Sequence, residues 1–258
     1  KLEVLYKHVT DSIKYAKRIQ EAILPPDRLV KKLLPNSFVL YKPKDIVSGD
    51  FYWIHKKKDK VLFATVDCTG HGVPGAFMSI VGYNLLKQVV SGTDTTEPGI
   101  ILDALNEGVS ETLHNTDEGA SAKDGMDLSL CSIDLTTLQV EFAGAYNPMY
   151  LIRNNEIQEI KADKFPIGFF VGHDRRKFTN HKIQLMKGDC IYIFSDGYAD
   201  QFGGPNGKKF MVNNFRNILL SIHAHPVEEQ KKMLDKNIEA WRGNLEQVDD
   251  MLVWGLKV

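Results

Sequence analysis

The chain has 258 residues, of which 43% are hydrophobic and 25% are charged, and its formal net charge is −1. This composition is typical of a folded globular protein and gives no indication of a disordered chain. The small net charge provides no overall field that would attract nucleic acid, and no apolar run approaches the roughly 20 residues of a membrane span.

The cysteines give a first indication of the compartment. Cys68, Cys131 and Cys190 are far apart and lie in or beside apolar, strand-like runs, and no signal-peptide pattern opens the chain. This pattern favours a reducing compartment and argues against a cysteine-based zinc site. We therefore expect a cytoplasmic location, which leaves open a membrane anchor in the parent protein. Because the first residue is Lys1 rather than Met, we expect the chain to be part of a longer protein.

Residues 1–24 predict the first helix, which ends at Pro25 and Pro26. Seven residues follow the a/d spacing of a coiled coil, and all of them except Ser12 are apolar: Leu2, Leu5, Val9, Ser12, Ala16, Ile19 and Ile23. The helix could pack on its own domain as an ordinary amphipathic helix. Alternatively it connects an upstream domain to this one and dimerises. On the second interpretation, residues 1–24 form a linker and dimerisation helix, and residues 37–258 form the main domain.

The remaining elements alternate in clusters rather than in βαβ units. Strands are predicted at residues 38–41, 50–54 and 61–66, followed by helices at about 74–90 and 98–114 and a polar loop at 115–123. An antiparallel meander is predicted at 126–134, 138–142, 148–153 and 157–160. Strands at 184–187 and 190–194, helices at about 208–221 and 226–241 and a strand at 251–258 follow. The pattern predicts an α+β fold with two antiparallel sheets between helical layers.

The stretch at residues 61–76 indicates a buried strand that ends in Asp67, then a tight turn and a helix. An apolar, β-rich run of this length is typical of a strand covered on both faces. Gly70 and Gly72 allow the sharp turn, and Pro74 suits the first turn of a helix, where its missing N–H is not needed. By itself the stretch fits either a functional carboxylate at the edge of a sheet or an ordinary strand-to-helix connection.

Three further aspartates stand in the same context as Asp67, at the end of a strand-like or apolar run or directly before one: Asp50, Asp196 and Asp249, the last followed by Asp250. A single aspartate in such a place is more often a turn residue or a helix cap than a ligand. Several carboxylates gathered without neighbouring cations repel one another and need a counter-charge. Mg²⁺ and Mn²⁺ are the usual solution, because these hard cations prefer oxygen ligands.

Four motifs follow one another along the chain, at residues 48–51 (SGDF), 67–76 (DCTGHGVPGA), 194–197 (FSDG) and 247–251 (QVDDM). In this order they resemble the metal-dependent protein phosphatases of the PPM (type 2C) family, and among these the bacterial SpoIIE-like subgroup. The resemblance runs from about Val39 to Val258. Residues 125–127 and 143–148 also resemble motifs of the subgroup. The family's α-β-β-α fold is therefore expected.

The resemblance implies a centre of two Mn²⁺ or Mg²⁺ ions per domain. Asp67 would bridge both ions and the backbone carbonyl of Cys68 would bind one of them. Asp196 and Asp249 would hold the other, and Asp50 would bind directly or through water. Asp50 and Asp67 would thus be catalytic, with a metal-activated water attacking phosphorus in line and no covalent enzyme intermediate.

His71 has two interpretations. The resemblance makes it a candidate general acid for the leaving serine or threonine oxygen, but a histidine that merely shapes the turn is equally compatible with the sequence. No arginine is clearly placed to bind phosphate, and Lys44 is a candidate for that role. His223 and His225 fit a loop between helices better than a metal pair, and the glycine-rich residues 203–207 lack the Lys-Ser/Thr ending of a phosphate loop.

The sequence thus predicts a serine/threonine phosphoprotein phosphatase that acts on a phosphorylated regulatory protein in bacterial signalling. By family analogy the substrate would be an anti-sigma-factor antagonist. The expected partners also include a second copy of the chain, bound through residues 1–24, and an upstream sensor domain, but no nucleic acid. Two alternatives stay open, namely a non-catalytic dimeric module that binds a partner protein and a hydrolase of small phosphoesters.

Overall fold

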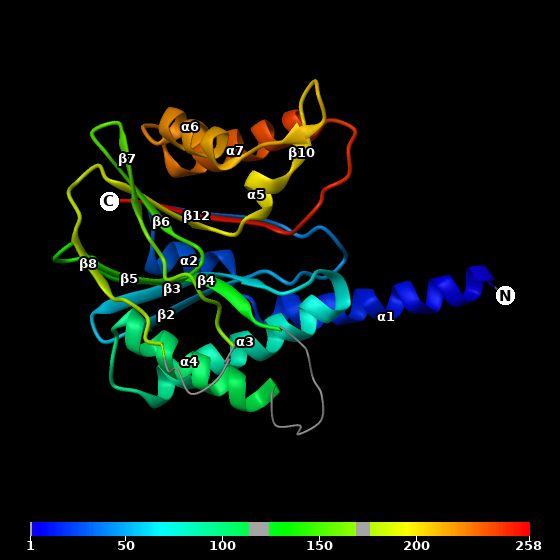
Figure 1. Ribbon diagram of the computed structural model, residues 1–258, viewed down its shortest axis with the longest axis horizontal. Coiled ribbons are helices and arrows are strands. Elements are labelled where there is room, and N and C mark those ends of the chain that lie inside the picture. The colour runs from blue at the N-terminus through cyan, green and yellow to red at the C-terminus, as the bar shows by residue number, and fades with distance from the viewer. Residues whose placement is uncertain (1, 114–123, 169–175) are drawn as a thin grey trace.

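The computed structural model describes residues 2–113, 124–168 and 176–258, so the predicted loop at 115–123 lies outside the described residues. Two five-stranded antiparallel sheets lie face to face between layers of helices (Figure 1). The first sheet contains, in spatial order, β1 (Ser37–Lys42), β12 (Met251–Lys257), β9 (Cys190–Phe194), β6 (Met149–Arg153) and β7 (Glu156–Ile160). The second contains β2 (Phe51–Lys57), β3 (Lys60–Cys68), β4 (Met126–Asp134), β5 (Gln139–Ala145) and β8 (His181–Gln184). The predicted fold class is confirmed.

The central strands of each sheet are buried on both faces, which explains their nearly continuous apolar sequences, whereas the edge strands β7 and β8 are partly exposed. In β3, Leu62 and Ala64 pack toward the outer helices, whereas Phe63 lies in the core between the sheets, because successive side chains of a strand point to opposite faces. Trp254 of β12 meets Phe63 from the other sheet, with ring centroids 5.2 Å apart. The space between the sheets is therefore a packed apolar core.

Each sheet carries its own helical layer. Helices α3 (Gly72–Gly92) and α4 (Pro98–Leu113) cover the second sheet, and α6 (Val212–Ile222) and α7 (Val227–Arg242) cover the first (Figure 1). The short helices α2 (Asp27–Leu33) and α5 (Gly197–Asp200) and the hairpin of β10 (Phe202–Gly203) and β11 (Lys208–Lys209) were not predicted. Helix α1 (Leu2–Ile23) occupies the predicted span and extends away from the body of the domain. None of the described helices is long and apolar enough to cross a membrane.

The predicted four-stranded meander is wrong, because the chain changes sheets between β5 and β6. β4 and β5 pair in the second sheet, while β6 and β7 pair in the first. At the crossing, Tyr146 adopts a positive φ of 57° and Pro148 precedes β6. The alternation of apolar residues is the same in either sheet, so the pattern identified the strands but not their partners.

Two other boundaries differ from the prediction. The strand expected at residues 184–187 is instead β8, which ends at Gln184, because the turn around Gly188 begins earlier than its apolar neighbours indicated. The N–H of Met186 donates to the Asp189 carboxylate at 2.8 Å, which closes that turn. The helix expected from residue 208 begins at Val212, since Lys208 and Lys209 form β11.

The three cysteines, Cys68, Cys131 and Cys190, are all buried free thiols.

Candidate functional site

The end of β3 and the turn after it have the predicted form. β3 ends at Cys68, α3 begins at Gly72, and Gly70 and Gly72 adopt positive φ values of 83° and 65°. Thr69 anchors the turn to the start of β4, since its N–H and its hydroxyl both lie 3.0 Å from the carbonyl oxygen of Gly125. The half-buried carboxylate of Asp67 is thus held at the edge of the second sheet.

Asp50 reaches the same edge because Gly49 lets two backbones approach closely. A Cβ at Gly49 would lie 2.4 Å from the carbonyl oxygen of Gly70 and 3.1 Å from that of Cys68, so no larger residue fits without a shift of the chain. Asp50 itself is only 2% exposed, and its Oδ2 atom has no hydrogen-bond partner among the described residues. An unpaired buried carboxylate oxygen is costly in a fold unless something else occupies it.

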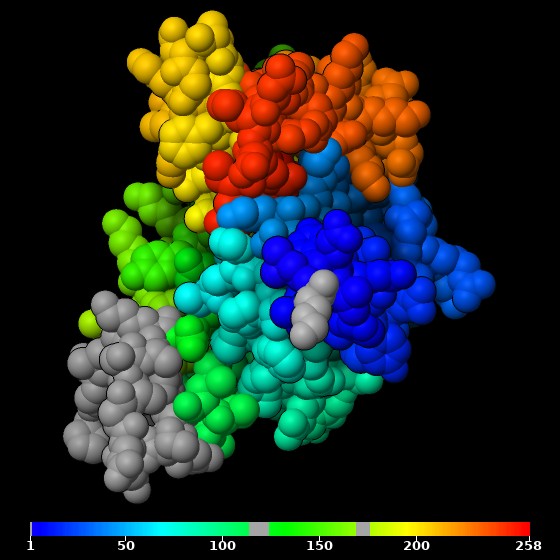
Figure 2. All heavy atoms as spheres, turned by 90° about the vertical axis from the view of Figure 1, so that its right-hand side faces the viewer, coloured from blue at the N-terminus to red at the C-terminus, as the bar shows by residue number. Residues whose placement is uncertain are grey.

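Asp196 and Asp249 come from the first sheet. The N–H of Ser195 donates to the carbonyl of Leu252 at 2.9 Å, which brings the ends of β9 and β12 together. A Cβ at Gly197 would lie 1.9 Å from the backbone oxygen of Asp250, so a glycine is required after Asp196. The segments around residues 45, 70 and 248 meet on one face, shown in light blue, cyan and red beside the dark-blue helix α1 (Figure 2).

Asp250 acts as a structural link between these segments rather than as a free ligand. Its Oδ1 accepts from the N–H of Lys44 at 2.7 Å and its Oδ2 from the N–H of Gly49 at 2.8 Å. Both carboxylate oxygens are therefore engaged with backbone donors of the loop before β2. Asp250 thus joins the start of β12 in the first sheet to the segment that carries Asp50.

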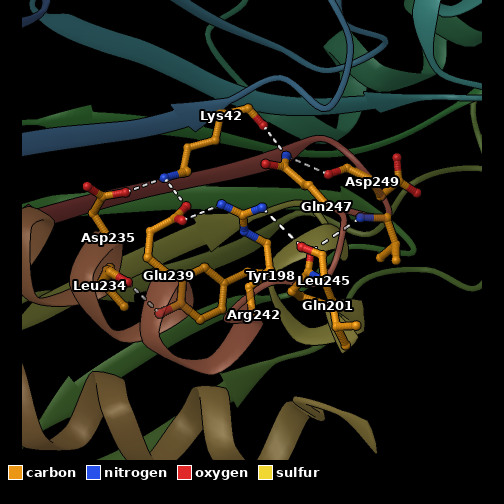
Figure 3. A network of polar contacts seen from close by, with 11 residues as sticks. Lys42, Tyr198, Gln201, Leu234, Asp235, Glu239, Arg242, Leu245, Gln247 and Asp249 are labelled. Atoms are coloured by element: carbon orange, nitrogen blue, oxygen red, sulfur yellow. Dashed lines mark hydrogen bonds and ion pairs between the residues drawn. The ribbon is translucent and has the colours of Figure 1, made fainter. Parts of the chain in front are cut away.

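A network of polar contacts holds the backbone at Asp249 in place. The side-chain amide of Gln247 donates to the carbonyl oxygens of Lys42 and Asp249 at 2.7 and 2.8 Å (Figure 3). The ammonium of Lys42 in turn pairs with Asp235 and Glu239 of α7, at 2.5 and 2.7 Å. The loop before β12 is consequently fastened to both β1 and α7.

The carboxylates perturb one another strongly. Burial, followed by the charge of Asp67, raises the pKa of Asp50 well above its usual value. Burial, followed by the charge of Asp196, likewise raises the pKa of Asp67. Asp196 opens to solvent, yet partial desolvation and the charge of Asp249 raise its pKa to about 6. The pKa of Asp249 is also raised, mainly by burial. The four predicted carboxylates therefore share one electrostatic environment, as the motifs indicated.

Asp127 belongs to this group, although the sequence gave it no role. It lies directly opposite Asp67 in the pairing of β3 with β4, and burial followed by the charge of Asp196 raises its pKa to about 7. The available signals were the motif at residues 125–127 and the position of Asp127 at the start of an apolar strand, but neither showed that this strand pairs with β3. That pairing is a tertiary contact between residues 60 positions apart, which no local pattern reveals.

His71 lies at the rim with two partners that were not assigned to it. Its Nδ1 is 2.8 Å from Oδ2 of Asp45, and its Nε2 is 3.0 Å from Nζ of Lys44. An ammonium group can only donate, so Nε2 is the acceptor and Nδ1 carries the proton donated to Asp45. In this arrangement Nε2 has no proton for a leaving group. The general-acid role of His71 stays a prediction, and it requires the contact with Lys44 to open.

The donor set fits hard divalent cations by its chemistry. It consists of carboxylate oxygens and one backbone carbonyl, and it includes the buried, unpartnered Oδ2 of Asp50. Across residues 2–113, 124–168 and 176–258, no three carboxylate, imidazole or thiol groups are arranged so that they would hold a metal ion as they stand. Ligation therefore requires these side chains to adjust.

His223, His225 and residues 203–207 lie in connections between elements. Nδ1 of His223 lies 2.7 Å from the carbonyl oxygen of Leu220, and His225 lies 3.3 Å from Glu229, both in the connection between α6 and α7. Residues 203–207 form the turn of the β10–β11 hairpin. These positions agree with the non-catalytic interpretations.

Comparisons with known proteins identify the family and agree with the observed fold. A family model described as "Stage II sporulation protein E (SpoIIE)" matches residues 57–258. The phosphoserine phosphatase RsbU of Bacillus subtilis (strain 168) is 24% identical over 203 residues, which are 77% of this chain and 56% of RsbU. This chain thus spans little more than half the length of that relative.

Solved structures extend the similarity to the whole fold. The SiaA PP2C domain of Pseudomonas aeruginosa matches with a TM-score of 0.89 at 30% identity, covering 98% of both chains. The PP2C phosphatase domain of SpoIIE from Bacillus subtilis, with a fragment of its regulatory domain, matches with a TM-score of 0.68 at 22% identity, covering 86% of this chain and 63% of the other.

Proposed function

Because the chain belongs to the SpoIIE family of PPM (type 2C) phosphatases, we propose that it hydrolyses phosphoserine or phosphothreonine on a regulatory protein in bacterial signal transduction. The observation that carries the proposal is the convergence of Asp50, Asp67, Asp196 and Asp249 from two sheets onto one electrostatic environment. Carboxylates whose pKa values are perturbed in this way mark functional sites.

We assign the metal ligands as the sequence predicted, with Asp50, Asp67, Asp196, Asp249 and the carbonyl of Cys68 holding two Mn²⁺ or Mg²⁺ ions. The ions would lower the pKa of a bound water and stabilise the charge that develops on the phosphoryl oxygens. The protein's own contribution is to position the ligands. The Gly49 contact, the Asp250 hydrogen bonds and the Gln247 network hold the loops from which the carboxylates project.

Lys44 and His71 stand at the edge of this group. The charge of the Lys44 ammonium opposes the rise in the pKa of Asp249, and His71 lies beside Lys44 through the contact at its Nε2. We propose that the Lys44 ammonium, the candidate from the sequence, meets a phosphoryl oxygen. Asp45 would keep the His71 ring in one orientation through its hydrogen bond to Nδ1.

The test is hydrolysis of p-nitrophenyl phosphate and of a phosphoserine peptide, with Mn²⁺ or Mg²⁺ added after treatment with a chelator. We expect activity that depends on the cation and that falls at least about 10³-fold in Asp67→Ala and Asp196→Asn, since each removes an ion ligand. Asp59→Asn is the matched control, because Asp59 is an exposed aspartate in the turn between β2 and β3.

Two results would favour the alternatives. Absence of activity together with no heat of Mn²⁺ binding in calorimetry would favour a non-catalytic module that binds a partner. Faster hydrolysis of nucleotides than of phosphopeptides would favour a small-molecule phosphoesterase. The identity of the regulatory protein, for which an anti-sigma-factor antagonist is our candidate, is tested by dephosphorylation of such a protein purified in its phosphorylated form.

We also assign residues 1–24 as a linker and dimerisation helix attached to an upstream sensor domain, in a protein whose phosphatase part lies in the cytoplasm. Much of the predicted seam is exposed, with Leu2 at 82%, Leu5 at 61% and Val9 at 51%. Near its other end, α1 and α3 form an apolar groove of about 280 Å³ that includes the exposed Phe77. A second copy of the chain would cover this apolar surface.

The contact between α1 and the site supports a regulatory role for the helix. Gln20 is the buried residue of α1, and its side-chain amide donates to the Ser48 carbonyl at 2.6 Å and accepts from the Ser48 N–H at 3.0 Å. Ser48 lies two residues before Asp50, and its hydroxyl receives the Asp50 N–H at 3.0 Å. A shift of α1 would therefore move the segment that carries Asp50.

Three variants separate dimerisation from regulation. Leu5→Glu with Val9→Glu should yield a monomer in light scattering, because it places charges in the seam. Gln20→Ala should change the Mn²⁺ concentration required for half-maximal activity while leaving the oligomeric state unchanged. If removal of residues 1–24 alters neither activity nor oligomeric state, the helix is only a spacer.

A further inference from the structure

A second recess opens directly beside Asp196. It has a volume of about 570 Å³ and lies between the β5–β6 crossing, the segment after β7 and helices α5 and α6. Its apolar part includes Pro148, Phe194 and Phe215, and one polar wall is formed by Lys161 and Lys164. Because Asp196 lines one side, a chain bound in this groove would lead to the carboxylates.

Some charged side chains along the groove form ion pairs, whereas others have no partner. Glu159 pairs with Arg216 at 3.1 Å and Asp200 pairs with Lys209 at 2.8 Å, so these side chains largely neutralise each other. Lys161 and Lys164 are exposed, and within the described part of the chain neither has a hydrogen bond or an ion pair. The wall they form is therefore positively charged and free to receive anionic groups.

Asn147 provides a second, independent indication of a ligand. Its side chain lines the groove and is only 9% exposed, yet its Nδ2 has no hydrogen-bond partner in the residues described. The backbone of Asn147 is firmly held, since its carbonyl accepts the Ser129 hydroxyl at 2.7 Å and its N–H donates to Ala145 at 2.6 Å. The side-chain amide has no partner on this firmly held backbone, and a peptide carbonyl could accept its proton.

We propose that this groove binds the polypeptide that flanks the phosphorylated residue, and that Lys161 and Lys164 select substrates with acidic side chains there. Asn147 would donate to the substrate backbone, and the apolar floor would receive a side chain. The inference rests on the proposed function, because it uses Asp196 as part of the reaction centre. It goes further by naming the substrate class, namely a phosphoserine or phosphothreonine with aspartate or glutamate nearby.

The experiment compares kcat/KM for three substrates with Mn²⁺ present. Two are phosphoserine peptides of equal length, one with aspartates on both sides and one with serines and glycines, and the third is p-nitrophenyl phosphate. We expect the wild type to prefer the acidic peptide about tenfold, as two exposed ion pairs allow. The double variant Lys161→Glu/Lys164→Glu should lose this preference, with hydrolysis of p-nitrophenyl phosphate unchanged. Raising the salt concentration should also reduce the preference, because exposed charges are screened.

Two further variants sharpen the result. Lys187→Glu is the control for net charge, since Lys187 is an exposed lysine before β9, at the opposite end of that strand from Asp196. It should retain the acidic preference. Asn147→Ala should lower kcat/KM severalfold for both peptides alike and leave the melting temperature unchanged, since the amide it removes has no partner in the fold.

The outcomes are distinct. If the acidic preference persists in the double variant, or disappears equally in Lys187→Glu, the groove does not select acidic substrates and the inference is wrong. If the wild type does not hydrolyse p-nitrophenyl phosphate with any divalent cation, the proposed function itself fails and the inference fails with it. Normal hydrolysis of p-nitrophenyl phosphate with peptides treated alike overturns only the inference.

Discussion

The two ends of β9 carry carboxylates in opposite environments, one paired with a cation and one among other carboxylates. Asp189, just before the strand, is almost fully buried and accepts three hydrogen bonds from the Arg153 guanidinium, at 3.0, 3.2 and 2.6 Å. Asp196, just after the strand, is surrounded by other aspartates. A buried carboxylate is normally paired, as Asp189 is. The carboxylates around Asp196 lack such a cation, so their ionised forms carry a cost that either protonation or a bound cation would remove.

Glu141 on β5 extends the comparison. Burial alone would raise its pKa, but hydrogen bonds from Lys60 and Asn180 bring the pKa below its usual value. Asp50, which is similarly buried, has a raised pKa and an unpaired oxygen. The difference shows that this fold can supply counter-charges to its buried acids and does so away from the candidate site. Buried acids without counter-charges lower the stability of the fold, and such a local loss of stability is typical of a functional site.

The largest expected effect on stability comes from breaking the paired end. Arg153→Ala should lower the free energy of unfolding by about 3–5 kcal/mol, because it leaves the buried Asp189 carboxylate without its cationic partner. Urea denaturation of the metal-free protein measures this. Lys17→Ala, which breaks an exposed pair with Glu21 on α1, is the control and should change stability by less than about 0.5 kcal/mol. Equal effects of the two variants would contradict the comparison.

The next effect is stabilisation of the unpaired end by a cation. Mn²⁺ at about 100 times its dissociation constant should stabilise the wild type by about 2.7 kcal/mol, since it binds the folded state only. The melting temperature should rise accordingly in thermal denaturation. Asp67→Asn should show little of this rise, whereas Arg153→Ala should show all of it. A rise of the same size in Asp67→Asn would mean that the cation binds elsewhere.

A smaller effect concerns pH. The pKa values of Asp196 and Asp127 are raised to about 6 and about 7, so both bind protons more tightly in the folded than in the unfolded state. The contribution of these two groups to the free energy of unfolding of the metal-free protein should therefore be greatest below about pH 4. It should decline as the pH rises to about 7. Asp127→Asn should reduce this decline and stabilise the protein at pH 8 by on the order of 1 kcal/mol, given solvent screening. A pH profile identical to that of the wild type would rule out the assigned pKa of Asp127.

The smallest effect separates two lysines that share Glu141. Lys182 lies 3.7 Å from the carboxylate and is 58% exposed, whereas Lys60 lies 2.6 Å away and is 24% exposed. Lys182→Ala should change the free energy of unfolding by less than about 0.5 kcal/mol, and Lys60→Ala by more than that. Chemical denaturation at pH 7 compares them directly. The reverse order would show that distance and burial do not control these pairs.

The elements that the sequence predicted well are those with a strong local pattern. β4, β9 and helix α7 lie within a residue or two of their predicted positions, because apolar periodicity and turn residues are local signals. The prediction failed where partners had to be chosen, as at the β5–β6 crossing. It also missed helix α5, a single turn that is too short for a periodic signal.

The candidate site shows the same division. Asp50, Asp67, Asp196 and Asp249 could be identified because each lies next to a strand end and a motif. Asp127 was part of the motif at residues 125–127 but received no role, since it becomes relevant only by pairing opposite Asp67. Asp45 was missed, because it becomes relevant only through a contact with His71. Asn147 was part of a recognised motif, but its unpaired amide is visible only when the surrounding side chains are in place.

By itself, the sequence indicated most of the strands and helices, the α+β class and the candidate acidic ligands, because these depend on neighbours along the chain. The tertiary structure alone decided how the sheets divide the strands, which carboxylates lack counter-charges and where an open groove with a wall of two lysines reaches Asp196. The physical reason is that pairing and desolvation are set by groups brought together from distant positions. Gln20 of α1 and Ser48, 28 residues apart, make such a contact two residues from Asp50.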